Sequence, residues 1–235
     1  MNARTCMVRQ FEEIAELDDE EKALLGELES SVQSYAAGEI LQTEGEENAP
    51  FFSLHEGWAC SIRLLPGGER QVLEVFLPGQ IMDLHSIGFS RSPSELLALT
   101  AIEACPIPRE RLETIFRKSP RLAQLFFVVL AREHALLTTR IIDIGRRPAA
   151  ERLGHFIIEL KIRTRSREKE FELPLTQSII GDALGMSSVH VSRTMTQLKD
   201  LNLISTHNRR LRIENMKELM HYCRFDPAYL SPGPT

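Results

Sequence analysis

The stretch LTQSIIGDALGMSSVHVSRTMTQLKDLNLIS, from Leu175 to Ser205, has the pattern of two short helices joined by a tight turn. Thr176 is placed to cap the first helix, Gly185 supplies the turn, and Ser187 or Ser188 caps the second helix. The first helix has an apolar face formed by Ile179, Ile180, Ala183 and Leu184. The residues of the second helix that we expect to face a core, by their helical spacing, are Val189, Val191, Met195 and Leu198. The pattern predicts a helix-turn-helix.

The other face of the predicted second helix is polar. It carries short donors and acceptors and one guanidinium, from Ser188, His190, Ser192, Arg193, Thr196 and Gln197. Such side chains hydrogen-bond to base edges and phosphates in the major groove of a duplex. This face therefore predicts that the chain binds double-stranded DNA.

Charge is distributed unevenly along the chain of 235 residues, which has a net charge of −5. Residues 1–145 contain 13 Lys and Arg against 23 Asp and Glu, whereas residues 146–235 contain 15 against 10. A basic part joined to an acidic part is typical of a DNA-binding domain carried by a sensor domain. The chain is 43% apolar, which is enough for one or two cores.

The sequence lacks the signals of export and of a membrane span. No apolar run is long enough to cross a bilayer, and the N-terminus has no hydrophobic signal core. The cysteines are far apart and have no CxxC spacing, which argues against a structural zinc site and fits a reducing cytosol. We expect a cytoplasmic protein with no membrane partner and no bound metal.

Residues from about 30 to 115 predict β-structure. The runs FFSLHEG, ACSIRLL and RQVLEVFL alternate apolar and polar residues, and glycine-containing turn signals separate them. Short strands at regular spacing indicate a compact antiparallel roll or barrel. Residues 11–29 predict one or two short helices, with Asp18 and Asp19 near the start of the second.

Residues 120–146 predict one long helix that starts at Pro120. Apolar positions spaced alternately by four and three form the series Ala123, Phe127, Leu130, His134, Leu137, Ile141 and Ile144. This heptad spacing is that of a coiled-coil seam and predicts a homodimer. The alternative is a helix packed on its own barrel. The helix can form the dimer seam and pack on its own barrel at the same time if a second apolar face contacts the barrel. Such a face is formed by Leu122, Leu125, Phe126 and Val129.

Arg147-Pro148 interrupts the helical pattern, because proline disfavours helical geometry in the residue before it. We interpret it as a hinge, followed by a new helix from Ala149 to about Ile162 and a charged loop over 163–170. After the helix-turn-helix, residues 203–205 and 211–213 predict the strands of a wing, with residues 207–210 at its tip. Basic tips of this kind contact phosphate rather than bases.

The barrel, the long helix, the proline hinge and the winged helix-turn-helix, in this order, resemble the Crp/Fnr family of bacterial transcription regulators. The segments that carry the resemblance are YAAGEILQTEGE, FLPGQIMDLHS and LPLTQSIIGDALGMSSVHVSRTMTQLKDLNLI. The sequence motifs DLHS and VHVSR are most similar to those of a proteobacterial group of this family without an assigned effector. The resemblance implies an α+β chain with a cupin-like, cyclic-nucleotide-binding-domain-like β-roll at residues 1–119. A dimerisation helix and hinge at 120–147 and a winged helix-turn-helix at 148–235 follow.

The family further implies a homodimer on a near-palindromic site, with one recognition helix in each major groove. By position, Thr176 and Gln177 match residues that contact the DNA backbone, and Ser187 and Ser188 open the recognition helix. Arg193 matches an arginine that binds guanine or phosphate, and Arg209 lies in the basic wing tip. The chain departs from the family at Val189, where well-studied members have a glutamate that reads cytosine. His190 is the neighbouring polar candidate, so the known operator rule does not transfer.

The sensor domain departs from the two familiar ligand patterns of the family. Members that bind cyclic AMP hold the phosphate with an arginine, and Glu95 near that place would repel it. The tentative effector pocket comprises Asp83, Leu84, His85, Ser86, Thr138 and Thr139. Iron–sulfur members use several N-terminal cysteines and one barrel cysteine, but here only Cys6 and Cys105 match, so the full set of four thiolate ligands is missing. We expect neither ligand.

Two histidines suggest further hypotheses. His85 lies where the carbon-monoxide-sensing member of the family has its haem histidine, so haem is a possible cofactor although we expect none. The alternative is a histidine hydrogen-bonded within the roll. His134 lies in the heptad seam, where protonation of two copies would drive them apart. The alternative there, which we favour, is a neutral, packed imidazole.

The sequence therefore predicts a DNA-binding transcription regulator and not an enzyme, since it has no Ser/His/Asp set, no phosphate-binding glycine loop and no placed carboxylate pair. Its expected partners are double-stranded DNA, a second copy of the chain, RNA polymerase and an effector of unknown identity. The alternatives are a haem-based sensor regulator that uses His85, and a signalling protein whose barrel binds a ligand.

Overall fold

The computed structural model describes residues 5–230, which form two compact units. Of these residues, the first unit takes 5–64 and 73–134, and the second takes 65–72 and 135–230. The ends of the predicted first and third parts, residues 1–4 and 231–235, lie outside the described range. None of the helices within 5–230 combines the length and the apolar character that crossing a bilayer requires.

Two short capped helices open the first unit. The Thr5 side chain accepts a hydrogen bond at the start of α1 (Cys6–Glu12), and Asp18 and Glu21 form a reciprocal capping box at the start of α2 (Asp19–Leu28). The predicted pair of helices is confirmed, although the first begins five residues before the predicted stretch.

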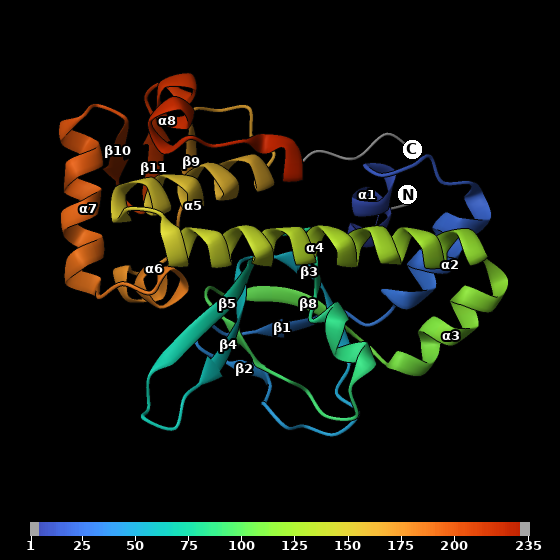
Figure 1. Cartoon of the computed structure of the whole chain (residues 1–235). Coiled ribbons are helices and arrows are strands. Elements are labelled where there is room, and N and C mark those ends of the chain that lie inside the picture. The colour runs from blue at the N-terminus through green and yellow to red at the C-terminus, as the bar shows by residue number, and fades with distance from the viewer. Residues whose placement is uncertain (1–4, 231–235) are drawn as a thin grey trace. The chain divides into compact units, whose positions relative to one another are not determined.

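Eight strands form the β-roll, in two four-stranded sheets (Figure 1). They are β1 (Gln33–Tyr35), β2 (Ile40–Gln42), β3 (Phe51–Glu56), β4 (Ala59–Leu64), β5 (Arg70–Phe76), β6 (Ile81–Met82), β7 (Glu95–Ala98) and β8 (Ile102–Ile107). The sheet orders are β1-β8-β3-β6 and β2-β7-β4-β5. Apolar side chains from both sheets meet in one core, which includes Phe52, Leu54, Phe76, Leu96 and Ile102. The predicted antiparallel roll is confirmed.

Residues 109–118 form helix α3 (Arg109–Lys118), where the sequence pattern predicted β-structure up to about residue 115. The prediction was wrong there because a short apolar run does not distinguish strand from helix. Leu112 and Ile115, spaced by three residues, are buried on one face of α3 and join a second core with α1, α2 and the first part of α4. In this core the Phe126 ring lies 4.8 Å from Phe11 between centroids.

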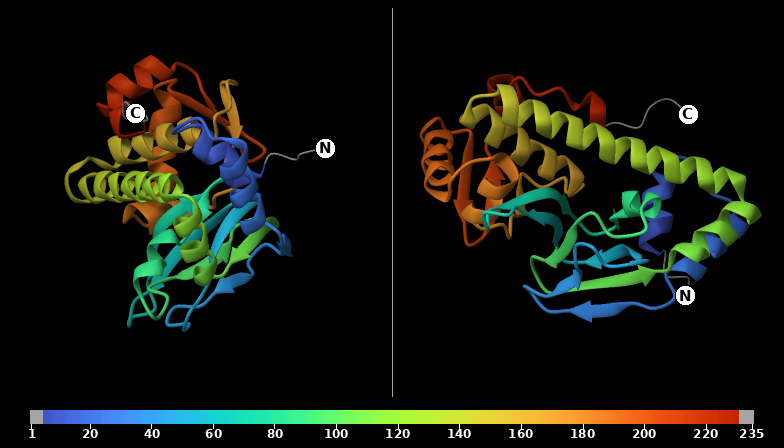
Figure 2. Two further views of the ribbon diagram at one scale, coloured as in Figure 1. Left: turned by 90° about the vertical axis from the view of Figure 1, so that its right-hand side faces the viewer. Right: turned by 60° about the horizontal axis from the view of Figure 1, so that its bottom comes forward.

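Helix α4 (Pro120–Arg146) has the predicted bounds and is one continuous helix, as Figure 2 shows. Pro148 has an extended conformation and is followed by α5 (Ala149–Arg163), so the predicted break and new helix are confirmed. A 3-10 turn, η1 (Leu84–Gly88), follows β6 in the first unit, and another, η2 (Pro227–Leu230), closes the described chain.

The second unit continues with β9 (Glu170–Glu172), α6 (Gln177–Leu184), α7 (Ser188–Asp200), β10 (Ile204–His207), β11 (Arg210–Ile213) and α8 (Met216–Cys223). The wing sheet has the order β10-β11-β9. Strands β10 and β11 were predicted from the sequence. Strand β9 was missed, because residues up to 170 were assigned to a loop. Strand β9 is only three residues long, and its partner β11 lies about forty residues later, so no local pattern marks it.

Candidate nucleic-acid interface and sensor interior

Helix α6 begins at a capped threonine and ends at a left-handed glycine. The Thr176 hydroxyl oxygen accepts a hydrogen bond from the Ile179 amide at 3.2 Å, and Gly185 has a φ of +63°. The turn also depends on Gly181, because a Cβ there would lie 2.4 Å from the Met186 carbonyl oxygen. The sequence analysis did not single out Gly181, since the close approach arises only when α6 and α7 are folded against each other.

Helix α7 is capped by Ser187, whose hydroxyl oxygen accepts from the His190 amide at 3.2 Å. Its buried stripe is Val191, Thr194 and Leu198. The predicted core face was wrong at Val189, which is 60% exposed. The buried stripe follows the spacing three and four from Val191, and this spacing leaves Val189 on the other side of the helix. Thr194 takes the buried position, where its hydroxyl donates to the His190 carbonyl at 2.8 Å.

The outer face of α7 holds the predicted polar set. Ser188, His190, Arg193, Thr196 and Gln197 are exposed, and Ser192 is half-buried. Two of these side chains have partners: the Thr196 hydroxyl donates to the Ser192 carbonyl at 3.2 Å, and the Gln197 amide donates to the Tyr222 hydroxyl at 3.3 Å. Arg193 has no ion-pair partner within residues 5–230, so its guanidinium projects a free fork of donors. Thr176 and Gln177, at the start of α6, are also exposed.

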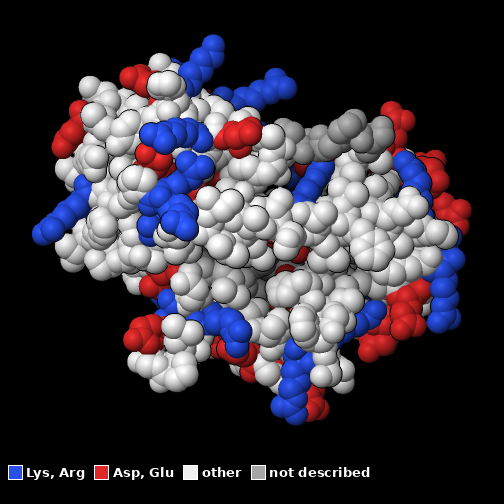
Figure 3. Space-filling model, viewed as in Figure 1, with Lys and Arg blue, Asp and Glu red and all other residues white. Residues whose placement is uncertain are grey.

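The wing ends in a two-residue turn of Asn208 and Arg209, both with positive φ, which matches the twist of a tight hairpin. Arg210, beside the turn, pairs with Glu170 of β9. Arg209 is exposed, and its carbonyl accepts a hydrogen bond from Leu173 at 2.8 Å. The basic charge that the tip leaves uncompensated is therefore that of Arg209. On the face drawn in Figure 3, Lys and Arg side chains predominate over the second unit.

A buried ionic cluster lies inside the second unit. Glu159 of α5 lies between the guanidiniums of Arg140 and Arg163, each at 2.9 Å. Burial opposes ionisation, but the two positive charges outweigh it and hold the pKa of Glu159 below its ordinary range. The guanidinium of Arg140 also lies 4.5 Å from the centre of the Phe156 ring. This cluster ties the end of α4 to α5.

The heptad positions of α4 are incompletely covered within the described chain. Phe127 and Ile141 are 69% and 72% exposed, and His134 is also exposed. The remaining members, Ala123, Leu130, Leu137 and Ile144, are half-buried. The second apolar face behaves differently, because Leu122 and Phe126 are buried in the core of the first unit. Exposed large apolar side chains on one helix face mark a surface that another chain can cover.

The predicted effector residues on the roll form a polar network that is already hydrogen-bonded. Asp83 is buried in a left-handed conformation. Its carboxylate accepts from Gln42 at 2.7 Å and from Ser94 at 3.3 Å, and lies 3.3 Å from His85 Nε2. Ser86 and Leu84 are buried beside it. The Asp83 carboxylate is therefore already engaged by side chains of the roll itself.

The other predicted ligand residues lie in ordinary surroundings. Thr138 is exposed and Thr139 half-buried, both on the part of α4 that belongs to the second unit. The His85 side chain is 41% exposed and faces Asp83, as the hydrogen-bonded alternative expected. Cys105 is buried, its thiol donates to the Leu28 carbonyl at 3.6 Å, and burial raises its pKa. Haem binding by His85 stays a prediction.

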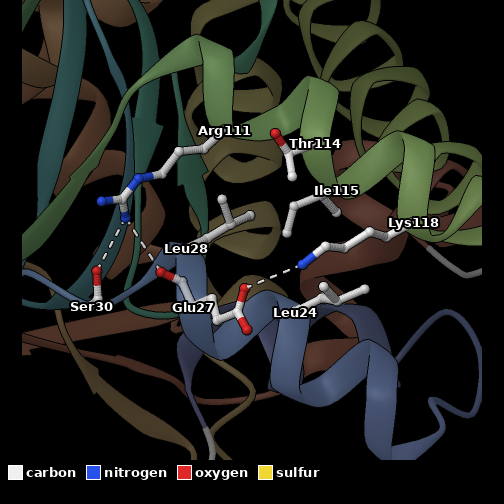
Figure 4. Close-up of a pocket in the computed structure, with 8 residues that line it drawn as sticks. All are labelled: Leu24, Glu27, Leu28, Ser30, Arg111, Thr114, Ile115 and Lys118. Atoms are coloured by element: carbon white, nitrogen blue, oxygen red, sulfur yellow. Dashed lines mark hydrogen bonds and ion pairs between the residues drawn. The ribbon is translucent and has the colours of Figure 1, made fainter.

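A pocket of about 380 Å³ lies between α2 and α3 (Figure 4). Leu24, Leu28 and Ile115 form its apolar part. The charged groups on its rim are paired: Arg111 donates to Ser30 at 3.1 Å, and Lys118 lies 4.0 Å from Glu27. The Arg111 partner is a neutral hydroxyl, so Glu27 is the one carboxylate on the rim beside two cationic side chains.

Two known families match separate parts of the chain. Residues 32–119 match the family described as the cyclic nucleotide-binding domain, and residues 151–222 match the Crp-like helix-turn-helix domain.

Two characterised relatives match most of the chain. The anaerobic regulatory protein of Aggregatibacter actinomycetemcomitans is 28% identical over 185 residues, which are 77% of this chain and 72% of that protein. The transcriptional activator protein Anr of Pseudomonas aeruginosa is 26% identical over 185 residues, 77% of this chain and 76% of that protein.

Among solved structures, FixK2 from Bradyrhizobium japonicum superposes with a TM-score of 0.74 at 23% identity. The match covers 87% of this chain and 98% of that one. At this identity the likeness establishes the fold alone.

Proposed function

The chain belongs to the Crp/Fnr family of transcription regulators and has its helix-turn-helix DNA-binding domain, and from this premise we propose how it reads DNA. A homodimer binds a near-palindromic duplex and places one copy of α7 in each of two major grooves. The observation that carries the proposal is the outer face of α7. It is polar and exposed, it includes the unpaired guanidinium of Arg193, and it stands on a buried stripe that fixes its orientation.

Side chains of α7 have separate tasks in this proposal. Arg193 supplies two parallel donors for the O6 and N7 of a guanine, or for a phosphate. His190 and the exposed Val189 lie near the start of the helix, where an imidazole can hydrogen-bond to a base edge and an isopropyl group can contact a thymine methyl. The hydroxyl-bearing residues that we assign to contacts around these are Ser187, Ser188, Ser192 and Thr196.

Contacts outside α7 hold the duplex by its backbone. Thr176 and Gln177 begin α6, where the free amides and the positive end of the helix dipole favour a phosphate. Arg209 at the wing tip adds a second phosphate contact, because Glu170 compensates its neighbour Arg210 but leaves Arg209 unpaired. These contacts position α7 without reading sequence.

The homodimer forms along the seam of α4, with Phe127, Leu130, His134, Leu137, Ile141 and Ile144 at the interface. Two large apolar side chains that are more than two-thirds exposed support this pairing. The resulting twofold axis sets the two half-sites about 34 Å apart, or one turn of DNA. The division into a sensor at 1–119, a dimerisation helix and hinge at 120–147 and a DNA-binding part at 148–235 is part of this proposal.

The first unit acts as a sensor or a contact surface for RNA polymerase. Glu95, whose carboxylate would repel a cyclic phosphate, supports a sensor without a cyclic nucleotide. An effector at Asp83, Leu84, His85, Ser86, Thr138 or Thr139 would need to shift an equilibrium by only about 1–3 kcal/mol to change occupancy 5–150-fold.

The test begins with selection of a binding site from random duplex DNA by the purified full-length chain. Binding of that site by Arg193→Ala is then compared with wild type and with Arg117→Ala, which removes an exposed arginine of α3. We expect Arg193→Ala to lose discrimination at one base pair by about 1–3 kcal/mol, and Arg117→Ala to keep it. Weaker binding with unchanged sequence preference would assign Arg193 to a phosphate, and unchanged affinity and preference would overturn the assignment of α7.

The dimer is tested separately by sedimentation. We expect Ile141→Glu to shift the chain to a monomer and to abolish tight binding to the full palindrome. Leu64→Glu, at another exposed apolar position on β4, serves as the control and stays dimeric. A fully dimeric Ile141→Glu variant would exclude the seam of α4 as the interface.

A further inference from the structure

Three side chains that commonly ligate metals meet in the first unit, whereas the residues assigned to DNA belong to the second unit. They are Cys6 of α1, Glu29 at the end of α2 and His55 of β3. Their sulfur, carboxylate oxygen and imidazole nitrogen all lie within 4.8 Å of one another. Within residues 5–230 this is the one cluster of three or more such groups.

The spacing of these atoms suits a tetrahedral metal ion. Bonds of about 2.0–2.1 Å to nitrogen and oxygen and about 2.3 Å to sulfur place neighbouring ligand atoms roughly 3.3–3.6 Å apart. The His55 Nε2 and Glu29 Oε1 atoms are 3.2 Å apart, close to one edge of that tetrahedron. The sulfur of Cys6 lies within 4.8 Å of both atoms.

The surroundings hold the carboxylate as the outer shell of a metal site does. The Met7 amide donates to both oxygens of Glu29 at 3.2 Å, and the Ser53 hydroxyl donates to Oε1. Metal-ligating carboxylates are oriented by such outer hydrogen bonds. The side chain of Glu29 is fully buried, so protein groups rather than bulk solvent hold its carboxylate in position.

The other two ligands also have defined neighbours. The guanidinium of Arg9 donates to the Cys6 sulfur at 3.5 Å, which holds this side chain in place. The buried Nε2 of His55 faces Glu29 without the geometry of a hydrogen bond. The imidazole and the carboxylate therefore face each other at 3.2 Å, as two ligands of one ion would.

We propose that Cys6, Glu29 and His55 bind one divalent transition-metal ion of the zinc and cobalt class through Sγ, one carboxylate oxygen and Nε2. A set of one sulfur, one nitrogen and one oxygen ligand favours such ions over magnesium or calcium, which prefer oxygen alone. The fourth position is open to water or to a small ligand. Binding displaces the proton of the Cys6 thiol and any proton on His55 Nε2, so affinity rises with pH.

The consequence for the fold follows from the elements that the ion would join. Cys6, Glu29 and His55 belong to α1, the end of α2 and β3, so the ion would tie the N-terminal helices to the roll. Because the unfolded chain has no preformed site, the ion would stabilise the first unit in proportion to its concentration. Cysteine spacing predicted no metal site, since the three ligands come from separate parts of the sequence and meet only in the fold.

The first experiment is a titration of the metal-stripped full-length chain with Co²⁺, followed by absorption. We expect one ion per chain, a thiolate-to-cobalt charge-transfer band, the visible bands of tetrahedral cobalt and loss of both on adding Zn²⁺. Absence of a charge-transfer band in the folded wild-type chain would overturn the proposal without any variant.

Variants then locate the site. Cys6→Ser is expected to lose the charge-transfer band, and His55→Gln to weaken Co²⁺ binding by at least about tenfold. Cys60→Ser, which alters another buried thiol of the first unit, is the matched control and keeps the spectrum. Fluorescence of Trp58, which lies in the first unit, reports whether each variant is folded.

The opposite pattern would contradict the assignment. A band that survives Cys6→Ser but disappears in Cys60→Ser or Cys105→Ser would place the metal elsewhere. Should Cys6→Ser fail to fold, the His55→Gln titration and the rise in wild-type melting temperature with Zn²⁺ but not Mg²⁺ still decide the question. DNA selection by the metal-stripped chain keeps this test separate from that of the proposed regulator.

Discussion

Glu29 and Glu159 are both buried carboxylates, one in each unit, but they are held in different ways. Glu159 is bracketed by two guanidiniums at 2.9 Å, which carry a permanent charge. Glu29 has no such partner: burial opposes its ionisation, but His55, Ser53 and Thr5 beside it outweigh burial and hold its pKa below the ordinary range. Hydroxyl donors and an imidazole carry protons that can be exchanged. The ion pairs of Glu159 therefore hold α4 and α5 together, whereas the surroundings of Glu29 can accept a cation.

The largest expected effect is the loss of charge at Glu159. Glu159→Gln removes the buried carboxylate charge that bridges Arg140 and Arg163, and we expect the second unit to lose about 3–5 kcal/mol of unfolding free energy. Urea unfolding followed by the near-ultraviolet circular dichroism of the tyrosines measures it, with the exposed Glu168→Gln as control. Equal stability of the two variants would mean that the cluster contributes no net stability.

The stability that Glu159 contributes also depends on pH, which sharpens the comparison with Glu29. Because the folded pKa of Glu159 is lowered, its stabilising contribution is fully present above the ordinary value of 4.5 and is lost as the pH falls through the folded pKa. We expect the stability difference between wild type and Glu159→Gln to shrink below pH 4.5. A difference that stays constant on acidification would show that Glu159 is not ionised in the folded chain.

A smaller effect is expected at Glu29. Glu29→Gln keeps the shape of the side chain but replaces one acceptor oxygen by a donor, so the Ser53 or Met7 hydrogen bond is weakened. We expect a loss of about 1–3 kcal/mol, observed by Trp58 fluorescence in the first unit, whereas the exposed Glu20→Gln has no effect. A loss as large as that of Glu159→Gln would show that both carboxylates are structural joints.

The smallest effect concerns a polar group at a helix start rather than in a core. Ser187→Ala removes the acceptor for the His190 amide and should cost about 1 kcal/mol of stability. Ser188→Ala, one residue later and exposed, should change stability by less than about 0.5 kcal/mol. Thermal unfolding of the two variants without DNA makes the comparison, and the reverse order would assign the cap to Ser188.

Local chemistry made much of this architecture predictable from sequence. Helix α4 was predicted to span residues 120–146 and does so, because Pro120 begins it and Pro148 ends the pattern. The cap at Thr176 and the left-handed turn at Gly185 were predicted for the same reason: a side-chain acceptor or a missing Cβ acts on its immediate neighbours. Periodicity failed at Val189, because which stripe of a helix is buried depends on the neighbours that cover it.

The sequence by itself determined most of the elements, with α3 and β9 as exceptions, and also the polar helix face that points to DNA. Only the tertiary structure decided which distant side chains meet. It placed the ligand atoms of Cys6, Glu29 and His55 within 4.8 Å of one another and set Glu159 between two arginines. It also paired β11 with β9, the third strand of the wing sheet. The physical reason is range: caps, turns and helix periods act over a few residues, whereas burial and charge pairing act between segments that the folded chain brings together.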